Sequence, residues 1–226
     1  MSTTMSTRIK HHPIQADSII FDVDGTIWDS RDTVVKAWNA VMEREYPEKG
    51  AFPKEFLTGL FGKTMEDIAA ALFPELEGKA RDEMAERCFQ YENELLEEMP
   101  GVVYEGVKET MEHLTKEFSL FIVSNCQCGY IEACMKGAGI TGLITDHLCY
   151  GDTLAPKSET LRRLIEKHGL KQPVYVGDTQ GDADACKEAG VPMIFVTYGL
   201  GEVEDPQISI DSMRELPNIV ERCTIC

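Results

Sequence analysis

The chain has 226 residues, with 22 Lys or Arg against 39 Asp or Glu, so its formal net charge at neutral pH is −17. Excess negative charge repels nucleic-acid phosphates and anionic lipid headgroups, which argues against nucleic acid and membrane surfaces as partners. Hydrophobic residues make up 43% of the chain, enough for a sizeable core, and no apolar run approaches the length of a membrane span.

The N-terminal residues are polar, and several cysteines occur in pairs. Residues 1–13 lack the apolar segment of a secretory signal, so we expect a polar, mobile arm and a cytoplasmic protein with its eight cysteines reduced. Cys223 and Cys226 form a C-x-x-C pair, and Cys126 and Cys128 flank one residue. Free thiols are the simpler interpretation of both pairs, with a zinc or redox site as the alternative.

Short apolar runs alternate with amphipathic stretches along most of the chain. The runs predict buried strands, and they lie at 18–21, 120–123, 174–176 and 193–196. Apolar residues at helical spacing predict helices at 107–118, 130–136, 158–168 and 182–189. Strands alternating with helices indicate an α/β fold with a doubly wound, parallel, Rossmann-like sheet.

The segment 30–100 differs, because its patterns are helical only. Helices are expected at 33–46, 54–58, 64–73 and 79–99, with prolines between them. An all-α block inserted after the first strand predicts a cap. We therefore expect a core made of residues 1–29 and 101–226, and a cap made of residues 30–100.

Polar side chains stand where three of the predicted strands end. Ligands of parallel α/β sheets bind beyond these carboxyl ends. The residues concerned are Asp22, Asp24, Ser124, Asn125 and Asp178, with Asp182 and Lys157 at the starts of nearby helices. Several carboxylates at one edge repel one another unless a hard cation such as Mg²⁺ binds between them.

This set of groups suits phosphoryl transfer. Hydrogen-bond donors for a phosphate are available on Ser124, Asn125 and Lys157 and on the backbone N–H groups of Gly25 and Thr26. A carboxylate facing phosphorus can act as a nucleophile and form an aspartyl-phosphate. A second acid two residues later can protonate the leaving oxygen and then activate water.

Four motifs, in this order and spacing, resemble those of the haloacid dehalogenase-like hydrolase superfamily. They are DVDGT at 22–26, SN at 124–125, the lysine of APKSE at 157, and GDTQGD at 177–182. The resemblance extends from residue 19 to about residue 205. It implies that Asp22 is the nucleophile and a magnesium ligand, and that Asp24 is the general acid and base with its backbone carbonyl on the metal. It further implies that Asp178 is a metal ligand and that Asp182 either binds or orients the metal.

The same resemblance assigns the phosphate site and the cap. Ser124 and Asn125 correspond to phosphate-binding residues, and Lys157 to the lysine that neutralises the phosphate and the nucleophile. The insert 30–100 is similar to the helical cap of the phosphoglycolate phosphatase and β-phosphoglucomutase-like branch. The resemblance therefore implies a magnesium-dependent phosphatase of a small phosphorylated metabolite.

Alternatives remain open at this level. Dehalogenases of the superfamily lack the acid at the position of Asp24, so carbon–halogen cleavage is disfavoured. A phosphomutase shares every motif. A pyrophosphate or phosphonate hydrolase is a second alternative, and phosphonate cleavage would need a cap lysine such as Lys54 or Lys63. A non-catalytic protein on the same scaffold would be expected to lack the nucleophile or the acid, and both are present.

Each candidate also has a purely structural interpretation. Asp24, Ser124 and Asp182 are residue types that commonly cap helices or turns, and Lys157 could be a solvated surface lysine. Lys63 is the candidate for contact with the non-phosphate part of the substrate. Trp28 is expected either to line the cleft between cap and core or to pack structurally. A homo-oligomer is possible, and the sequence does not decide it.

Overall fold

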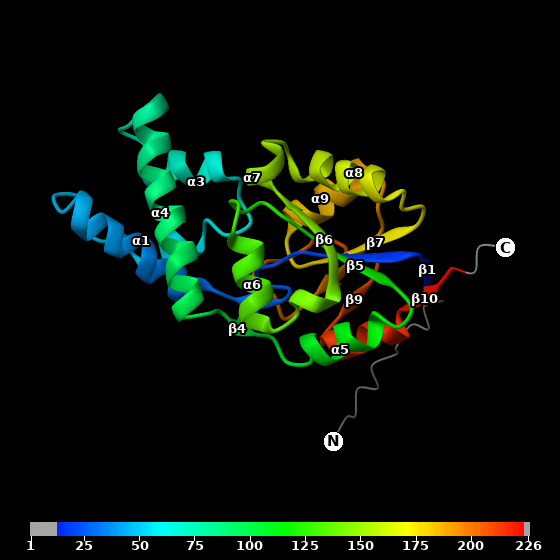
Figure 1. Ribbon diagram of the computed structural model, residues 1–226. Coiled ribbons are helices and arrows are strands. Elements are labelled where there is room, and N and C mark those ends of the chain that lie inside the picture. The colour runs from blue at the N-terminus through cyan, green and yellow to red at the C-terminus, as the bar shows by residue number, and fades with distance from the viewer. Residues whose placement is uncertain (1–12, 224–226) are drawn as a thin grey trace, which may run out of the picture.

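The computed structural model describes residues 13–223. The predicted N-terminal arm up to residue 12 and Cys226 lie outside the described residues. The described chain forms a six-stranded parallel sheet with helices on both faces and a separate helical segment on one side (Figure 1).

The central sheet has the strand order β6-β5-β2-β7-β8-β9. Its strands are β2 (Ser18–Phe21), β5 (Ser119–Ser124), β6 (Ile144–Cys149), β7 (Pro173–Gly177), β8 (Met193–Val196) and β9 (Ser209–Ile210). The middle strands are buried on both faces, which explains their continuous apolar runs. Strand β2 lies between β5 and β7, so the ends of these three strands are neighbours.

Two layers of helices cover the sheet. Because side chains alternate along a strand, Ile19 and Phe21 pack into one apolar cluster and Ile20 into another. The first cluster includes α5 (Val107–Leu114) and α6 (Tyr130–Ala138), and the second α8 (Lys157–His168) and α9 (Gln180–Ala189). Helices α8 and α9 lie above the sheet in Figure 1 and α5 lies below it. The predicted doubly wound α/β fold is confirmed.

Four helices between residues 31 and 98 enclose an apolar cluster of their own. They are α1 (Arg31–Glu45), α2 (Lys54–Thr58), α3 (Met65–Leu72) and α4 (Gly78–Glu98). Strands β3 (Trp28–Asp29) and β4 (Val102–Val103) pair antiparallel where the chain enters and leaves this segment. The assignment of 30–100 as a functional cap stays a prediction at this point.

Smaller elements complete the fold and were harder to predict. Strands β1 (Ile14–Ala16) and β10 (Val220–Arg222) form a separate parallel pair. Short helical turns lie at η1 (Thr141–Leu143), α7 (Tyr150–Thr153) and η2 (Met213–Asn218). The edge strand β6 was not predicted from the sequence, because Asp146 and His147 interrupt its apolar pattern.

None of the helices within residues 13–223 is both long enough and apolar enough to cross a membrane.

Candidate active site

The carboxyl ends of β2, β5 and β7 bring the predicted residues to one edge of the sheet. Asp22 directly follows β2, and its backbone N–H donates to the carbonyl of Val176 in β7 at 2.9 Å. Ser124 is the last residue of β5, and Asp178 directly follows β7. Strand register therefore gathers side chains that lie as far as 156 positions apart in the sequence.

A buried lysine connects two of the carboxylates. Lys157 is the first residue of α8, and its Nζ donates to Asp22 Oδ1 at 2.9 Å and to Asp182 Oδ1 at 2.6 Å. Burial lowers the pKa of Lys157, but the charges of Asp182 and Asp22 outweigh this and hold its pKa above the usual value. Burial raises the pKa of Asp22 to about 6 against the lowering effect of Lys157. Lys157 is thus a charged group of the site and not a surface lysine.

Asp182 is held from several directions. Its Oδ2 accepts hydrogen bonds from Thr179 Oγ1 at 2.7 Å and from Thr179 N at 3.0 Å, and its Oδ1 accepts from Lys157 and from Tyr175 OH at 3.2 Å. Thr179 in turn caps α9. Burial acts to raise the pKa of Asp182, but Lys157 outweighs it and the pKa is lowered. Asp182 combines the capping role with the positioning of Lys157.

Asp178 has one oxygen without a partner. Its Oδ2 accepts from the N–H groups of Leu200 at 2.7 Å and Gly201 at 3.2 Å, whereas its buried Oδ1 has no hydrogen-bond partner among the described residues. Burial, with the charge of Asp22 and Asp182, raises the pKa of Asp178 to about 8. An orphaned, buried carboxylate oxygen costs stability unless a ligand or a proton satisfies it.

The buried carboxylates fit a hard divalent cation. One oxygen from each of Asp22, Asp178 and Asp182 lies within 4.8 Å of the other two. Gly25 adopts φ +81°, and a Cβ there would lie 2.0 Å from Asp178 Oδ2, so only glycine lets this turn pass so close to the carboxylate. Because Asp182 already accepts bonds on both oxygens, Asp22 and Asp178 are the better ligands of the three. Oxygen donors of this kind are those that Mg²⁺ and Ca²⁺ prefer.

Asp24 is held by a different set of donors from those of the other carboxylates. Its Oδ1 accepts hydrogen bonds from Ser30 Oγ at 2.7 Å, Tyr130 OH at 2.7 Å and Trp28 Nε1 at 3.0 Å. Burial raises the pKa of Asp24 to about 7 despite the opposing effect of Ser30 and Tyr130. The three donors fix Oδ1 and leave Oδ2 free for another partner. Trp28 is buried in the core and packs edge-on against Tyr130, with 5.8 Å between the ring centroids. Its indole N–H is one of the three donors to Asp24.

The predicted phosphate donors surround the same edge. Buried Thr26 Oγ1 and Asn125 Oδ1 have no hydrogen-bond partner among the described residues. Asn125 Nδ2 donates to the carbonyl of Gly62, at 3.0 Å, in the loop before α3. Ser124 is buried beside these groups. This edge, the predicted phosphate edge, is therefore in direct contact with the helical segment.

A small cavity lies between the strand ends and the helical segment. Its volume is about 50 Å³, room for about three to five water molecules. The core contributes the side chains of Asp22, Asp24, Ser124, Asn125 and Lys157, and the helical segment contributes Val34, Trp38, Leu60, Phe61, Lys63, Met65, Ile68 and Glu92. Lys63 contributes to the lining and is otherwise exposed, and its contact with a substrate stays a prediction.

Glu92 of α4 is a buried acid at the far wall of this cavity. Its Oε2 accepts a hydrogen bond from Trp38 Nε1. Burial raises the pKa of Glu92 to about 8 against the lowering effects of Gln127 and Trp38. The raised pKa favours the neutral acid, and that form can donate a hydrogen bond into the cavity.

Several residues of the site escaped the sequence analysis. Ser30, Tyr130 and Tyr175 hold Asp24 or the Lys157 cluster, and Glu92 lines the cavity. None of them belongs to a short motif, and each reads locally as an ordinary strand or helix residue. Tyr175 could have been suspected, because it lies three residues before Asp178 in a buried strand.

The chain is similar in sequence and in structure to known proteins. A family model described as haloacid dehalogenase-like hydrolase matches residues 19–196. A phosphoglycolate phosphatase of Vibrio parahaemolyticus is 30% identical over 222 residues, covering 89% of this chain and 95% of the relative. The pyrophosphatase PpaX of Halalkalibacterium halodurans is 26% identical, covering 92% of this chain and 98% of the relative. A crystal structure from Haemophilus somnus, described as a predicted phosphoglycolate phosphatase, superposes with a TM-score of 0.78 at 23% identity over 91% of this chain and 98% of that one.

The buried acid of the cavity gives a stability prediction. A carboxyl group whose folded pKa is raised keeps its proton in the native state, so stability falls as pH rises from its unfolded value of 4.5 toward about 8. Glu92→Gln keeps the hydrogen bonds without the charge. As pH rises across this interval, we expect the free energy of unfolding of Glu92→Gln minus that of the wild type to increase by at least about 1 kcal/mol.

Urea denaturation at pH values below, within and above this interval checks it. Glu94→Gln, at an exposed position of the same helix, is the matched control and should show no such trend. A constant difference between Glu92→Gln and the wild type at all pH values would contradict the burial of a neutral acid.

Proposed function

The chain belongs to the haloacid dehalogenase-like hydrolases and is a phosphatase of that family, and on this premise we propose that it hydrolyses a small phosphorylated metabolite in a Mg²⁺-dependent reaction through an aspartyl-phosphate on Asp22. The observation that carries the proposal is the buried set of Asp22, Lys157 and Asp178, in which one carboxylate oxygen is left without a partner.

Asp22 is the proposed nucleophile. Lys157 and Tyr175 contact its Oδ1, and Lys157 keeps the carboxylate ionised in a buried position. A carboxylate oxygen of Asp22 forms a bond to phosphorus while the bond from phosphorus to the leaving oxygen breaks. Bound Mg²⁺, held by Asp22 and Asp178 with the backbone carbonyl of Asp24, would neutralise charge on the transferring group.

Asp24 is the proposed general acid and base. Its pKa of about 7 makes both the protonated and the ionised form available near neutral pH, as this double role requires. The acid form donates its proton to the leaving oxygen. The carboxylate then takes a proton from a water molecule that attacks phosphorus, which releases phosphate and restores Asp22. Ser30, Tyr130 and Trp28 hold one oxygen and direct the other toward the cavity.

The phosphate is proposed to lie at the strand ends. Ser124, Asn125, Thr26 and Lys157 supply side-chain donors, and Gly25 and Thr26 supply backbone N–H groups. Asp182 is proposed to act through Lys157, because both its oxygens already accept hydrogen bonds from protein groups. Residues 30–100 are proposed to act as a cap that excludes water from the cavity, since they form its far wall.

The cavity suggests the class of leaving group. Its volume of about 50 Å³ favours a small group, such as the glycolate of phosphoglycolate or part of a sugar. Lys63 offers a cation for an anionic leaving group, and Glu92 offers a hydrogen bond for a hydroxyl. Pyrophosphate hydrolysis is the second candidate, favoured by the similarity to the PpaX pyrophosphatase.

Removing the nucleophile tests the mechanism. We expect Asp22→Asn to lower kcat for p-nitrophenyl phosphate in Mg²⁺ by about 10³-fold or more, because an amide does not form the acyl-phosphate. Circular dichroism should show an unchanged fold. Asp184→Asn, at an exposed position of α9, is the control and should retain activity. Normal turnover by Asp22→Asn would defeat the proposal.

Metal dependence is the second test. EDTA should abolish activity and added Mg²⁺ should restore it, because the buried carboxylates need a cation to accept a phosphate dianion. Asp178→Asn should need a higher Mg²⁺ concentration for half-maximal activity, whereas Asp184→Asn should match the wild type. Full activity in the presence of excess EDTA would rule out the metal-assisted reaction.

A substrate panel separates the two candidate functions. Phosphate release should be compared for phosphoglycolate, sugar phosphates and inorganic pyrophosphate, and we expect the highest kcat/KM for a small monoester. Lys63→Ala should raise KM for anionic substrates with little change in kcat. Lys54→Ala is the control, because Lys54 pairs with Asp32 outside the cavity lining. Preference for pyrophosphate over every monoester would favour the second candidate instead.

A further inference from the structure

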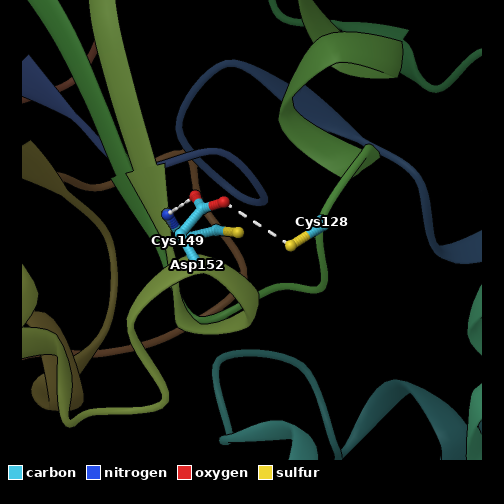
Figure 2. Close-up of side chains that lie close together, drawn as sticks. All are labelled: Cys128, Cys149 and Asp152. Atoms are coloured by element: carbon cyan, nitrogen blue, oxygen red, sulfur yellow. Dashed lines mark hydrogen bonds between the residues drawn. The ribbon is translucent and has the colours of Figure 1, made fainter.

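Two cysteines and an aspartate come together beside the active site without taking part in it. Cys128 lies in the loop between β5 and α6, Cys149 is the last residue of β6, and Asp152 lies in α7 (Figure 2). One sulfur or oxygen atom from each residue lies within 4.8 Å of the other two. The sequence had suggested free thiols for Cys128 and had not connected it with Cys149.

Backbone contacts hold these side chains in place. The N–H of Gly151 donates to the carbonyl of Cys126 at 3.1 Å. A Cβ at Gly151 would lie 2.5 Å from the nitrogen of Cys128, so the glycine lets the two loops touch. Asp152 Oδ2 accepts a hydrogen bond from the N–H of Cys149 at 2.8 Å, and Oδ1 accepts one from the thiol of Cys128 at 3.5 Å (Figure 2). The carboxylate is therefore fixed by one oxygen and presents the other to sulfur.

The donor set selects the kind of cation. Two sulfurs and one carboxylate oxygen suit Zn²⁺, whereas Mg²⁺ and Ca²⁺ prefer oxygen ligands only. Tetrahedral Zn²⁺ with bonds of about 2.0–2.3 Å spaces its ligand atoms by about 3.5–3.8 Å. The 3.5 Å between Cys128 Sγ and Asp152 Oδ1 falls in this range. Cys128 and Asp152 are exposed and Cys149 is buried, so an ion could enter from solvent and keep water as a fourth ligand.

The protonation of Cys128 argues against a reactive-cysteine role for this residue. Burial, with the charges of Cys149 and Asp152, raises the pKa of Cys128 to about 12. A thiol that stays protonated at neutral pH is a poor nucleophile toward oxidants and alkylating agents. A metal ion can still bind, because it displaces the thiol protons as it coordinates.

We propose that Cys128, Cys149 and Asp152 bind one Zn²⁺ ion at a site separate from the hydrolytic centre. Binding forms two bonds from sulfur and one from carboxylate oxygen to the metal and releases two thiol protons to solvent. Cys149 lies in register with Ser124 on the neighbouring strand, and Cys128 lies four residues beyond Ser124. The ion would therefore tie the end of β6 and α7 to the loop that carries the phosphate donors.

Titration of the full chain with Co²⁺ in the presence of a non-coordinating reductant tests this site. Coordination by thiolate sulfur gives a charge-transfer absorption that the carboxylates of the hydrolytic centre do not give. We expect one such Co²⁺ per chain, displaced by one equivalent of Zn²⁺. Cys128→Ser and Cys149→Ser should each weaken binding by about 100-fold or more, and Asp152→Asn by about tenfold or more.

Two controls locate the signal. The double variant Cys223→Ser/Cys226→Ser removes the C-terminal C-x-x-C pair, and Asp22→Asn alters the hydrolytic centre. Both variants should keep the full charge-transfer absorption. Cys128 is exposed, so Cys128→Ser tests the site even if a change at buried Cys149 impairs folding. No absorption in the wild type, an undiminished signal in Cys128→Ser, or its loss in the C-terminal double variant would each overturn the proposal.

Discussion

The interaction on which the site depends is the contact of buried Lys157 with Asp22 and Asp182. Three carboxylates that are at most 5% exposed meet at this edge of the sheet, and isolated buried charges of one sign are strongly destabilising. Lys157 offsets part of that cost by donating to two of the three. Removing only the lysine would leave the buried charges of Asp22 and Asp182 without a positive partner. The stability of the cluster therefore depends on the lysine and the two carboxylates together.

The rest of the architecture follows from holding this cluster. Asp182 reaches Lys157 because Thr179 caps α9 and fixes the orientation of the carboxylate. Asp178 approaches the turn after β2 so closely that residue 25 must be glycine. Oδ1 of Asp178 accepts no hydrogen bond from the described protein groups, so its charge is not compensated by them. The fold therefore fixes the positions of the acids and leaves a place that a ligand or a proton can satisfy.

The sequence predicted the parts of the structure that local patterns encode. Apolar runs that end in polar clusters located β2, β5, β7 and β8, and with them the placement of Asp22, Ser124 and Asp178. Edge strand β6 was missed, because its side chains are only partly buried and its pattern is mixed. Tyr130 and Glu92 were missed for a different reason. Their importance comes from tertiary contacts with Asp24 and with the cavity, and such contacts leave no mark on the residues next to them in sequence.

The contact between Asn125 and Gly62 joins the phosphate edge to the helical segment. Asn125 belongs to the loop after β5. Gly62 lies in the loop before α3, and the next residue in that loop, Lys63, lines the cavity. If residues 30–100 act as the proposed cap, a leaving group too large for the cavity would separate these two residues and open the site to water. One too small would leave the apolar wall around Trp38 and Leu60 in contact with solvent. On the proposed reaction, selectivity thus arises from closure of residues 30–100 over the leaving group, while the strand ends bind the phosphoryl group common to all substrates.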